Sequence, residues 1–310
     1  MDIDVSLSDP PSDARASGAA GVDLHRIARH VRWHILNTVA QSKAGHIGGP
    51  LSMADLVVAL YFRELNIDPH RPDAPGRDRF VLSKGHSAIG LYSVLALRGY
   101  FPVAELATFD HGDSRLQGHP DMRLTPGIDV STGSLGQGLS AAVGIALGAR
   151  MAGQAFRTWV MLGDGELQEG MVWEAVNSAS RFELSSLTAI VDVNGLQQFG
   201  WPAVDGRDRF DRSEPWAHVD LAAIFRGYGW NVIEIDGHDF AAIFAAFDEA
   251  GENARATTRP TVILAGTIKG QGISFTRGTY TWHNGVASEE QLATARAELM
   301  IEGETDESAA

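Results

Sequence analysis

The tripeptide "GDG" at 163–165 is the first part of the sequence whose residue types and spacing indicate chemistry. It ends the apolar run 159–162, and the carboxylates Glu166 and Glu169 follow without a basic residue among them. Glycines on either side of Asp164 let the backbone approach a ligand closely, and the helix expected next offers free N–H groups that suit a phosphate. The Asp164 carboxylate would repel a phosphate, so we expect a divalent cation between the two. Mg²⁺ typically takes one or two protein oxygens and completes its shell with phosphate oxygens and water.

A second metal ligand should come from the end of a neighbouring strand. Asn194 closes the next predicted strand along the chain, and the ends of adjacent parallel strands lie only about 5 Å apart. Its side-chain carbonyl and a backbone carbonyl, such as that of Leu196, would complete the protein's share of the site. For the tripeptide alone, a simple tight turn is an open alternative, and Asn194 favours the metal.

Glu169 extends the apolar stripe of the following predicted helix, Val172, Val176 and Ala179, backwards by one turn. A carboxylate at such a position is expected in a core or an interface, where it would need a partner and have a raised pKa. The alternative is that Glu169 caps the first turn of the helix, where acidic side chains are favoured. The spacing alone leaves both open, and it assigns no role to Glu166.

The elements that must position these residues follow from apolar patterning. Continuous aliphatic runs predict strands at 158–162, 187–193, 230–235 and 261–266, and "RFVLSKGH" predicts a shorter one that ends in a Gly-His turn. Helical spacing predicts helices at 23–43, 52–65 with Ser52 as N-cap, 87–100, 168–181, 219–228 and 239–250, and in "GQGLSAAVGIALGARM".

Alternating strands and helices of this kind predict an α/β fold, a doubly wound, mostly parallel sheet with helices on both faces. Ligands bind such sheets outside the carboxyl ends of the strands. The turns expected to carry function are therefore "SKGH", "GDGE", "VNGLQQ", "DGHD" and "IKGQG".

Composition narrows the function classes. The chain has 310 residues, 44% hydrophobic and 21% charged, with a net charge of −14 that argues against a nonspecific nucleic-acid binder. Cysteine is absent, which excludes disulfides, a thiolate zinc site and a thiol nucleophile. No apolar run is long enough to span a membrane, and the polar start is typical of a disordered extension rather than a signal peptide. We therefore expect a cytoplasmic protein.

Lysine is rare in this sequence. Only Lys43, Lys84 and Lys269 occur, against 22 arginines. A compositional bias toward arginine explains the low number. Each lysine nevertheless lies beside a Gly-rich or His-bearing stretch, "SKAGHIGG", "LSKGH" or "IKGQG", which favours a functional role for those stretches.

Several motifs together resemble a known family. "GDGELQEGMVWEA" followed by "AIVDVNGLQQFG" resembles the thiamine-diphosphate signature, in which an asparagine follows GDG after the next strand. The motifs "KAGHIGGPLSMADLVVALYF", "DRFVLSKGHSAIGLYSVL", "QGHPD", "TPGIDVSTGSLGQGLSAAVGIALG" and "IDGHD" resemble transketolase in order and spacing. The resemblance covers residues 22–285.

The resemblance implies a set of site residues. Thiamine diphosphate would be held with Mg²⁺, or Ca²⁺ or Mn²⁺ in its place, by the metal ligands Asp164, Asn194 and Leu196 (through its backbone carbonyl). Residues implied to contact the cofactor are His86, Gly133, Leu135, Gly163, Gly165 and Asn194. Histidines implied to line the substrate channel are His46, His119 and His283. Glu169 and Glu174 match acids at the family's subunit interface, and His238 is expected to be structural.

The length of the chain implies a divided enzyme, because a full transketolase chain is roughly twice as long. We expect a disordered leader at 1–21, a diphosphate-binding domain at 22–285, and a C-terminal helix with an acidic tail at 286–310. The chain would then be the N-terminal subunit of a split transketolase, which moves a two-carbon ketol unit from a ketose to an aldose, typically sugar phosphates. Its expected partner is a separate C-terminal subunit in a two-plus-two heterotetramer, and a homodimer of the chain alone is possible.

Other functions remain open at this point. A split transketolase specialised for an unusual sugar fits the same motifs. A 1-deoxyxylulose-phosphate synthase and the α subunit of a 2-oxo acid dehydrogenase carry related signatures but fit less well, the first because its chain is longer, the second because it lacks the histidines of "SKGH" and "GHPD". A non-catalytic cofactor-binding homologue is disfavoured by Asp164, Asn194, His86 and His119.

Overall fold

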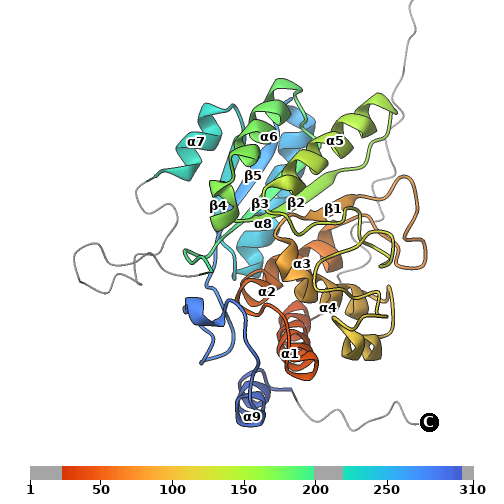
Figure 1. Ribbon diagram of the computed structural model, residues 1–310. Coiled ribbons are helices and arrows are strands. Elements are labelled where there is room, and N and C mark those ends of the chain that lie inside the picture. Colours follow the sequence, from red (N-terminus) through yellow and green to blue (C-terminus); the bar gives the residue numbers. More distant parts are fainter. Residues whose placement is uncertain (1–22, 199–218, 302–310) are drawn as a thin grey trace, which may run out of the picture.

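A single parallel sheet organises the chain in the computed structural model, which describes residues 23–198 and 219–301 (Figure 1). Its strand order is β1-β2-β3-β5-β4, and every neighbouring pair is parallel. The strands are β1 (Arg79–Leu82), β2 (Thr158–Gly163), β3 (Leu187–Val193), β4 (Asn231–Asp236) and β5 (Thr261–Gly266). The predicted strands are thus confirmed to within a residue or so at each end.

Helices cover both faces of the sheet, as the doubly wound prediction requires (Figure 1). Along β2 the side chains of Trp159 and Met161 enter one core, and those of Val160 and Leu162 enter the other. Burial on both faces explains why this strand is a continuous apolar run rather than an alternating one. The predicted fold class is confirmed.

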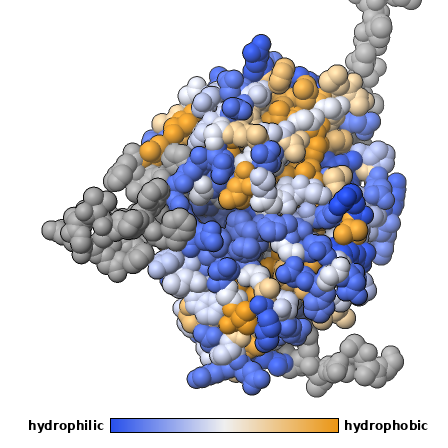
Figure 2. Space-filling model, viewed as in Figure 1, coloured by the Kyte–Doolittle hydropathy of each residue, from blue (hydrophilic) through white to orange (hydrophobic). Residues whose placement is uncertain are grey.

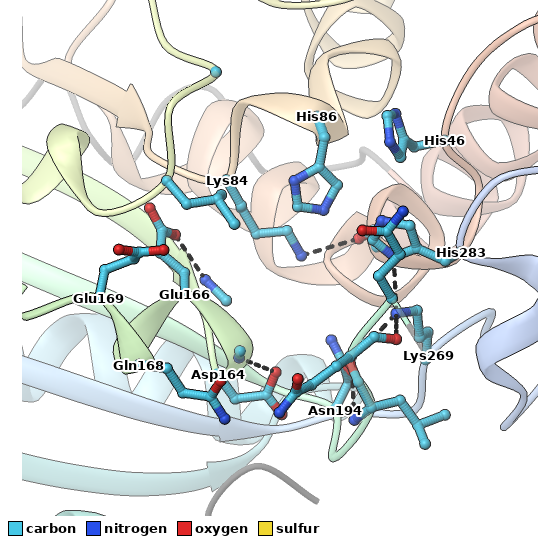
Figure 3. Close-up of a pocket in the computed structure, with 18 residues that line it drawn as sticks. His46, Lys84, His86, Asp164, Glu166, Gln168, Glu169, Asn194, Lys269 and His283 are labelled. Carbon is cyan, nitrogen blue, oxygen red and sulfur yellow. Dashed lines mark hydrogen bonds between the residues drawn. The ribbon is translucent and has the colours of Figure 1, made fainter. Parts of the chain in front are cut away.

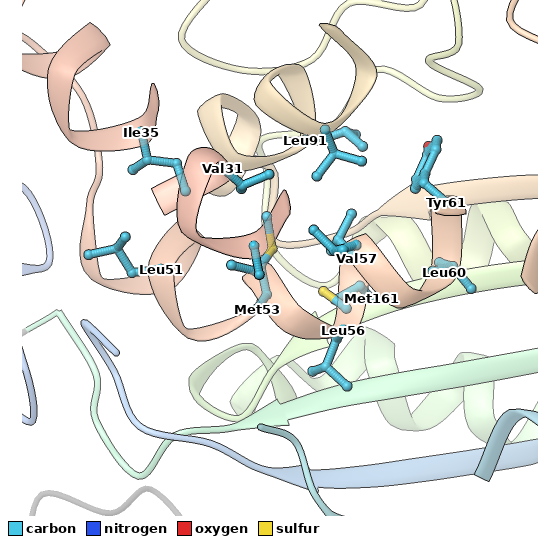
Figure 4. Packing of buried hydrophobic residues seen from close by; sticks show 14 of the residues in the cluster. Val31, Ile35, Leu51, Met53, Leu56, Val57, Leu60, Tyr61, Leu91 and Met161 are labelled. Carbon is cyan, nitrogen blue, oxygen red and sulfur yellow. The ribbon is translucent and has the colours of Figure 1, made fainter. Parts of the chain in front are cut away.

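The first core lies between the sheet and the helices α1 (Leu24–Ser42), α2 (Gly48–Ser52), α3 (Ala54–Ala59), α4 (Ala88–Arg98) and α8 (Phe240–Ala256). Val31, Met53, Val57 and Met161 meet in this core (Figure 4). The second core involves α5 (Gln137–Met151), α6 (Gly170–Arg181) and α7 (Leu221–Gly227). The last helix, α9 (Glu289–Glu298), packs against α1.

The helix predicted from Ser52 begins earlier than expected. Ser52 is the last residue of α2, and a π-helical turn at Leu60–Glu64 follows α3, so the N-cap prediction is wrong. Pro50 is tolerated because the N–H that it lacks would be unpaired in the first turn anyway. The Ser52 hydroxyl instead donates to Asp192 Oδ2 at 2.6 Å.

Two sequence predictions concern segments beyond this description. The leader at 1–21 and the end of the acidic tail lie outside the described residues. Within the described ranges, none of the helices combines the length and apolar character needed to cross a membrane.

Candidate active site

A cavity of about 380 Å³ opens at the carboxyl edge of the sheet, where the turns after β1, β2, β3 and β5 converge (Figure 3). Most residues singled out from the sequence line it: His46, His86, Gly133, Leu135, Gly163, Asp164, Gly165, Glu169, Asn194, Leu196 and His283. Lining residues that sequence reasoning did not assign are Gly49, Lys84, Glu166, Gln168, Gln197, Gln198 and Lys269. His119 and Glu174 do not line it.

Asp164 meets the loop after β3, as the strand-end argument predicts. Its Oδ1 accepts from the Gly165 N–H at 2.8 Å, and its Oδ2 accepts from the Gly195 N–H at 2.6 Å. On the same loop, Asn194 Oδ1 accepts from the Leu196 N–H at 3.1 Å. Burial, and then the charge of nearby Asp192, raise the pKa of Asp164 to about 7. A cation bound to this carboxylate would favour its charged form.

The donor set here suits a hard cation. Among the described residues, no group of three His, Asp or Glu side chains is arranged to hold a metal ion. One carboxylate combined with neutral oxygens is another kind of donor set, and Asp164, the Asn194 amide and the Leu196 carbonyl line the cavity together. Oxygen ligands of this kind fit Mg²⁺, Ca²⁺ or Mn²⁺.

The two glycines around Asp164 leave space for a ligand. A Cβ added at Gly163 would meet only Lys84 Cδ, at 3.9 Å, and one added at Gly165 would meet only Gln197 Cγ, at 3.6 Å. The sequence analysis expected a helix with free N–H groups directly after "GDG". A 3₁₀ turn at Gly165–Gln168 lies there instead and precedes α6. The N–H of Gly165 is already taken by Asp164.

Glu166, which had no role in the sequence analysis, ties three parts of the cavity wall together. Its buried carboxylate accepts from Ser83 Oγ at 2.5 Å, from the Gly136 N–H at 2.9 Å and from the Gly163 N–H at 3.1 Å. These donors come from the turn after β1, the start of α5 and the end of β2. Glu166 thus connects three segments of the cavity wall through hydrogen bonds.

Two of the three lysines are buried at this site. Lys84 forms an ion pair with Asp192, which also accepts from Ser52 and Thr267. Lys269 Nζ donates to the backbone oxygen of Gln197 at 2.8 Å and contacts His283 Nδ1 at 3.0 Å. Burial and the charge of Lys84 lower the pKa of Lys269 to about 8, which leaves it mostly protonated at pH 7.

Three histidines form a cluster on one side of the cavity. The ring centroids of His46, His86 and His283 lie 5.1 Å apart in each pair. The segment carrying His283 is held to the start of α2, since the Ile47 N–H donates to the His283 carbonyl at 3.1 Å. His119 lies further from His46, with 6.3 Å between their ring centroids.

The three clustered histidines, His46, His86 and His283, are neutral near pH 7. Burial, followed by neighbouring positive charges, lowers the pKa of His46, lowers that of His86 well below its usual value, and lowers that of His283 to about 3. Because the Lys269 ammonium donates to His283 Nδ1, the His283 proton must sit on Nε2. A neutral imidazole can donate with one nitrogen and accept with the other.

The two predicted interface acids are exposed in this chain. Glu169 lies at the cavity rim as the N-cap of α6, where its side chain makes no capping hydrogen bond. Glu174 is exposed on α6. Glu169 is therefore not buried within this chain, and its contact with another subunit stays a prediction.

His238, expected to be structural, anchors the loop that carries Lys269. Its Nε2 accepts from the Ile268 N–H at 2.9 Å, so its proton sits on Nδ1, 2.8 Å from Asp55 Oδ2. Arg32 joins the network with two hydrogen bonds to Asp55, of 3.0 and 2.6 Å, and one to the Gln271 carbonyl at 3.0 Å.

Comparison with known proteins places this geometry in a family. The model of the transketolase thiamine-diphosphate-binding domain matches residues 24–306. The chain is 43% identical over 282 residues to a 6-deoxy-6-sulfo-D-fructose transketolase subunit from Clostridium sp. (strain MSTE9), covering 91% of this chain and 98% of that protein. It is 37% identical to an apulose-4-phosphate transketolase subunit from Actinobacillus succinogenes, covering 90% and 97%.

Solved structures agree with the sequence matches. A transketolase variant from Pichia stipitis superposes with a TM-score of 0.79 at 32% identity. The match covers 90% of this chain but only 41% of the Pichia stipitis chain. The chain thus spans less than half the length of that transketolase chain, while it spans nearly all of the two relatives named as subunits.

Proposed function

Because the chain belongs to the transketolase family, as its thiamine-diphosphate-binding domain, we propose that it is the N-terminal subunit of a two-component transketolase. With a separate partner subunit it would transfer a two-carbon ketol unit from a ketose to an aldose. The observation that carries this proposal is the meeting of Asp164, Asn194 and Leu196 with a cluster of neutral histidines around one cavity.

The cofactor proposal assigns each part of the cavity a task. Asp164, Asn194 and the Leu196 carbonyl would hold Mg²⁺, or Ca²⁺ or Mn²⁺. Residues proposed to contact the diphosphate are Gly163, Gly165 and His86, and those proposed to lie against the rings are Gly133 and Leu135. When bound, thiamine diphosphate supplies a carbon nucleophile and a store for the electron pair released on C–C cleavage.

The chain's own histidines would handle the sugar. Neutral His46 and His283 can each hydrogen-bond a hydroxyl group and move a proton near neutral pH. The Nε2–H of His283, set by Lys269 at Nδ1, makes this residue a donor to a substrate oxygen. His119 is proposed to act further along the channel, since its ring lies next to Gly133 but does not line the cavity.

The partner proposal is supported by the relatives whose names say subunit and whose lengths this chain nearly matches. The partner would supply a pyrimidine-binding and a C-terminal domain in a heterotetramer, and the chain alone would form a homodimer. We place the complex in the cytoplasm, without nucleic acid or membrane as partners. The domain limits proposed are 22–285 for the cofactor domain and 286–310 for the C-terminal helix and tail.

A specialised sugar is the second candidate substrate. The two relatives described above are named for 6-deoxy-6-sulfo-D-fructose and apulose-4-phosphate rather than for the common sugar phosphates. The match to the transketolase domain model disfavours the α subunit of a 2-oxo acid dehydrogenase.

The test is a coupled ketose-to-aldose assay with the full chain, with and without its partner subunit. We expect turnover only when both subunits, thiamine diphosphate and Mg²⁺ are present, because the relatives that this chain nearly matches in length are named as subunits. Robust turnover by the chain alone would refute the two-component proposal. Absence of turnover with any ketose, despite cofactor binding, would favour the non-catalytic homologue.

A further inference from the structure

A buried network of three side chains lies outside the cavity. Asp55 on α3 accepts two hydrogen bonds from Arg32 on α1, of 3.0 and 2.6 Å, and its Oδ2 lies 2.8 Å from Nδ1 of His238 in the turn after β4. Arg32 is 6% exposed and Asp55 5%, and none of the three residues lines the cavity. Because buried ion pairs often contribute little net stability, the segments that this network holds indicate its role.

The charge of Asp55 determines the direction of these hydrogen bonds. Burial opposes that charge, but the hydrogen bond from His238 and the charge of Arg32 outweigh it and lower the pKa of Asp55. A carboxylate only accepts hydrogen bonds, so His238 must carry its proton on Nδ1. Its Nε2 can then accept from the Ile268 N–H, at 2.9 Å.

The network holds the loop after β5 at two points. His238 accepts from the Ile268 N–H, and Arg32 Nε donates to the Gln271 carbonyl at 3.0 Å. These two points lie on either side of Lys269 in the chain. Side chains from α1 and from the turn after β4 therefore fix the backbone that carries Lys269.

The position of Lys269 in turn determines the tautomer of His283. The Lys269 Nζ lies 3.0 Å from His283 Nδ1 at the cavity (Figure 3). An ammonium group has donors and no acceptor, so His283 Nδ1 must accept and the ring proton must lie on Nε2. Without this donor, a neutral imidazole can carry its proton on either nitrogen. The loop after β5 thus selects the His283 nitrogen that can donate to a ligand.

We propose that Arg32, Asp55 and His238 are positioning residues that act through Lys269 on His283. They hold the loop after β5 so that the ammonium group meets Nδ1 and the Nε2–H is available to a substrate oxygen. The tautomer of His283 depends on this chain alone, whereas its effect on the sugar rests on the proposed function.

The test is an NMR spectrum of the full chain labelled with ¹⁵N in its histidine rings, recorded without cofactor. The His283 signals are identified by their loss in His283→Gln. We expect the wild type to favour the Nε2–H tautomer of His283 about 10-fold or more, because the hydrogen bond from Lys269 is charge-assisted. His238→Leu removes the acceptor of the Ile268 N–H, and it should reduce this preference about 3-fold or more.

Two further variants serve as controls. His238→Gln should recover part of the preference, because an amide can donate to Asp55 and accept from Ile268. His70→Leu, which removes an exposed histidine, should leave the His283 signals unchanged.

Circular dichroism melting reports whether each variant folds. If His238→Leu does not fold, Gly272→Ala takes its place in the same spectrum. The added Cβ would lie 2.6 Å from Arg32 Cδ, so it must push that side chain away from the Gln271 carbonyl. The expected loss of tautomer preference is the same.

The catalytic consequence is measured with the assembled enzyme, the full chain with its partner subunit. His238→Leu should lower kcat/KM for the ketose about 10-fold, since a displaced donor orients the substrate poorly, and His238→Gln should restore part of it. A folded His238→Leu variant whose His283 keeps the wild-type tautomer would refute the inference, even with a lowered melting temperature, because His238 would then act on stability alone. A shifted tautomer together with an inactive wild-type complex would uphold the positioning and refute the proposed function.

Discussion

At the scale of single residues, the cavity depends on side chains whose roles are visible only in three dimensions. Glu166 accepts hydrogen bonds from Ser83 and Gly136, which lie far from it in the chain. Lys84 pairs with Asp192 across the first and third strands of the sheet. Asp164 and Asn194 could be selected from the sequence because each directly follows a predicted strand. The contacts of Glu166 and Lys84 could not be predicted, because they join turns that only the folded chain brings together.

A substitution of Glu166 tests whether its hydrogen bonds stabilise the fold. Replacing it by alanine leaves three donors of the cavity wall without their acceptor, two of them backbone N–H groups. We expect Glu166→Ala to lower the free energy of unfolding by about 2 to 4 kcal/mol, measured by urea denaturation. Glu169→Ala, which removes an exposed acid without a capping bond, should change it by less than about 0.5 kcal/mol. Equal effects of the two substitutions would contradict the role given to Glu166.

At the scale of elements, strands were easier to predict than helix starts. β3 and β5 are continuous buried apolar runs and were predicted at their observed bounds. The start of α2 was missed because "GGP" is typical of a break in helical structure. Contacts with Lys269 and Ser87 explain the glycines there, since a Cβ at Gly48 or Gly49 would meet one of these side chains at 2.9 Å. Tertiary packing thus overrides the local signal.

A single substitution can test the close packing of α5 against the turn after β1. A Cβ at Gly138 would lie 2.5 Å from Ser83 Cβ and 2.6 Å from Ser83 Cα, so Gly138→Ala must shift α5 or the turn. We expect a loss of about 1 to 3 kcal/mol in the free energy of unfolding. Because Ser83 also binds Glu166, the shift should weaken cofactor binding as well.

Gly144→Ala is the control on the same helix. A Cβ there would meet nothing within 4 Å, so only the helix propensity changes. We expect this variant to be more stable by about 0.5 to 1 kcal/mol in the same urea titration. A destabilised Gly144→Ala, or an unaffected Gly138→Ala, would show that α5 packs differently.

At the scale of the whole molecule, one face combines a hydrophilic band with apolar side chains gathered over α5 and α6 (Figure 2). Large apolar residues exposed near this region include Leu135, Met151 and Met171, and Met151 is 80% exposed. Leu135 and Glu169 also line the cavity. The proposed partner subunit would cover such a surface at the mouth of the cofactor site. Sequence alone could suggest this partner only through the family resemblance, because an exposed face has no signature in apolar spacing.

The central claim is that Asp164, with Asn194 and Leu196, holds the metal ion through which this chain binds thiamine diphosphate. The most direct measurement is calorimetric titration of the assembled enzyme with thiamine diphosphate, in Mg²⁺ and after chelation with EDTA. We predict binding by the wild type only with Mg²⁺, no metal-dependent binding by Asp164→Ala, and wild-type affinity for Asp113→Ala, which removes an exposed acid. Unchanged affinity in a folded Asp164→Ala variant would contradict the claim.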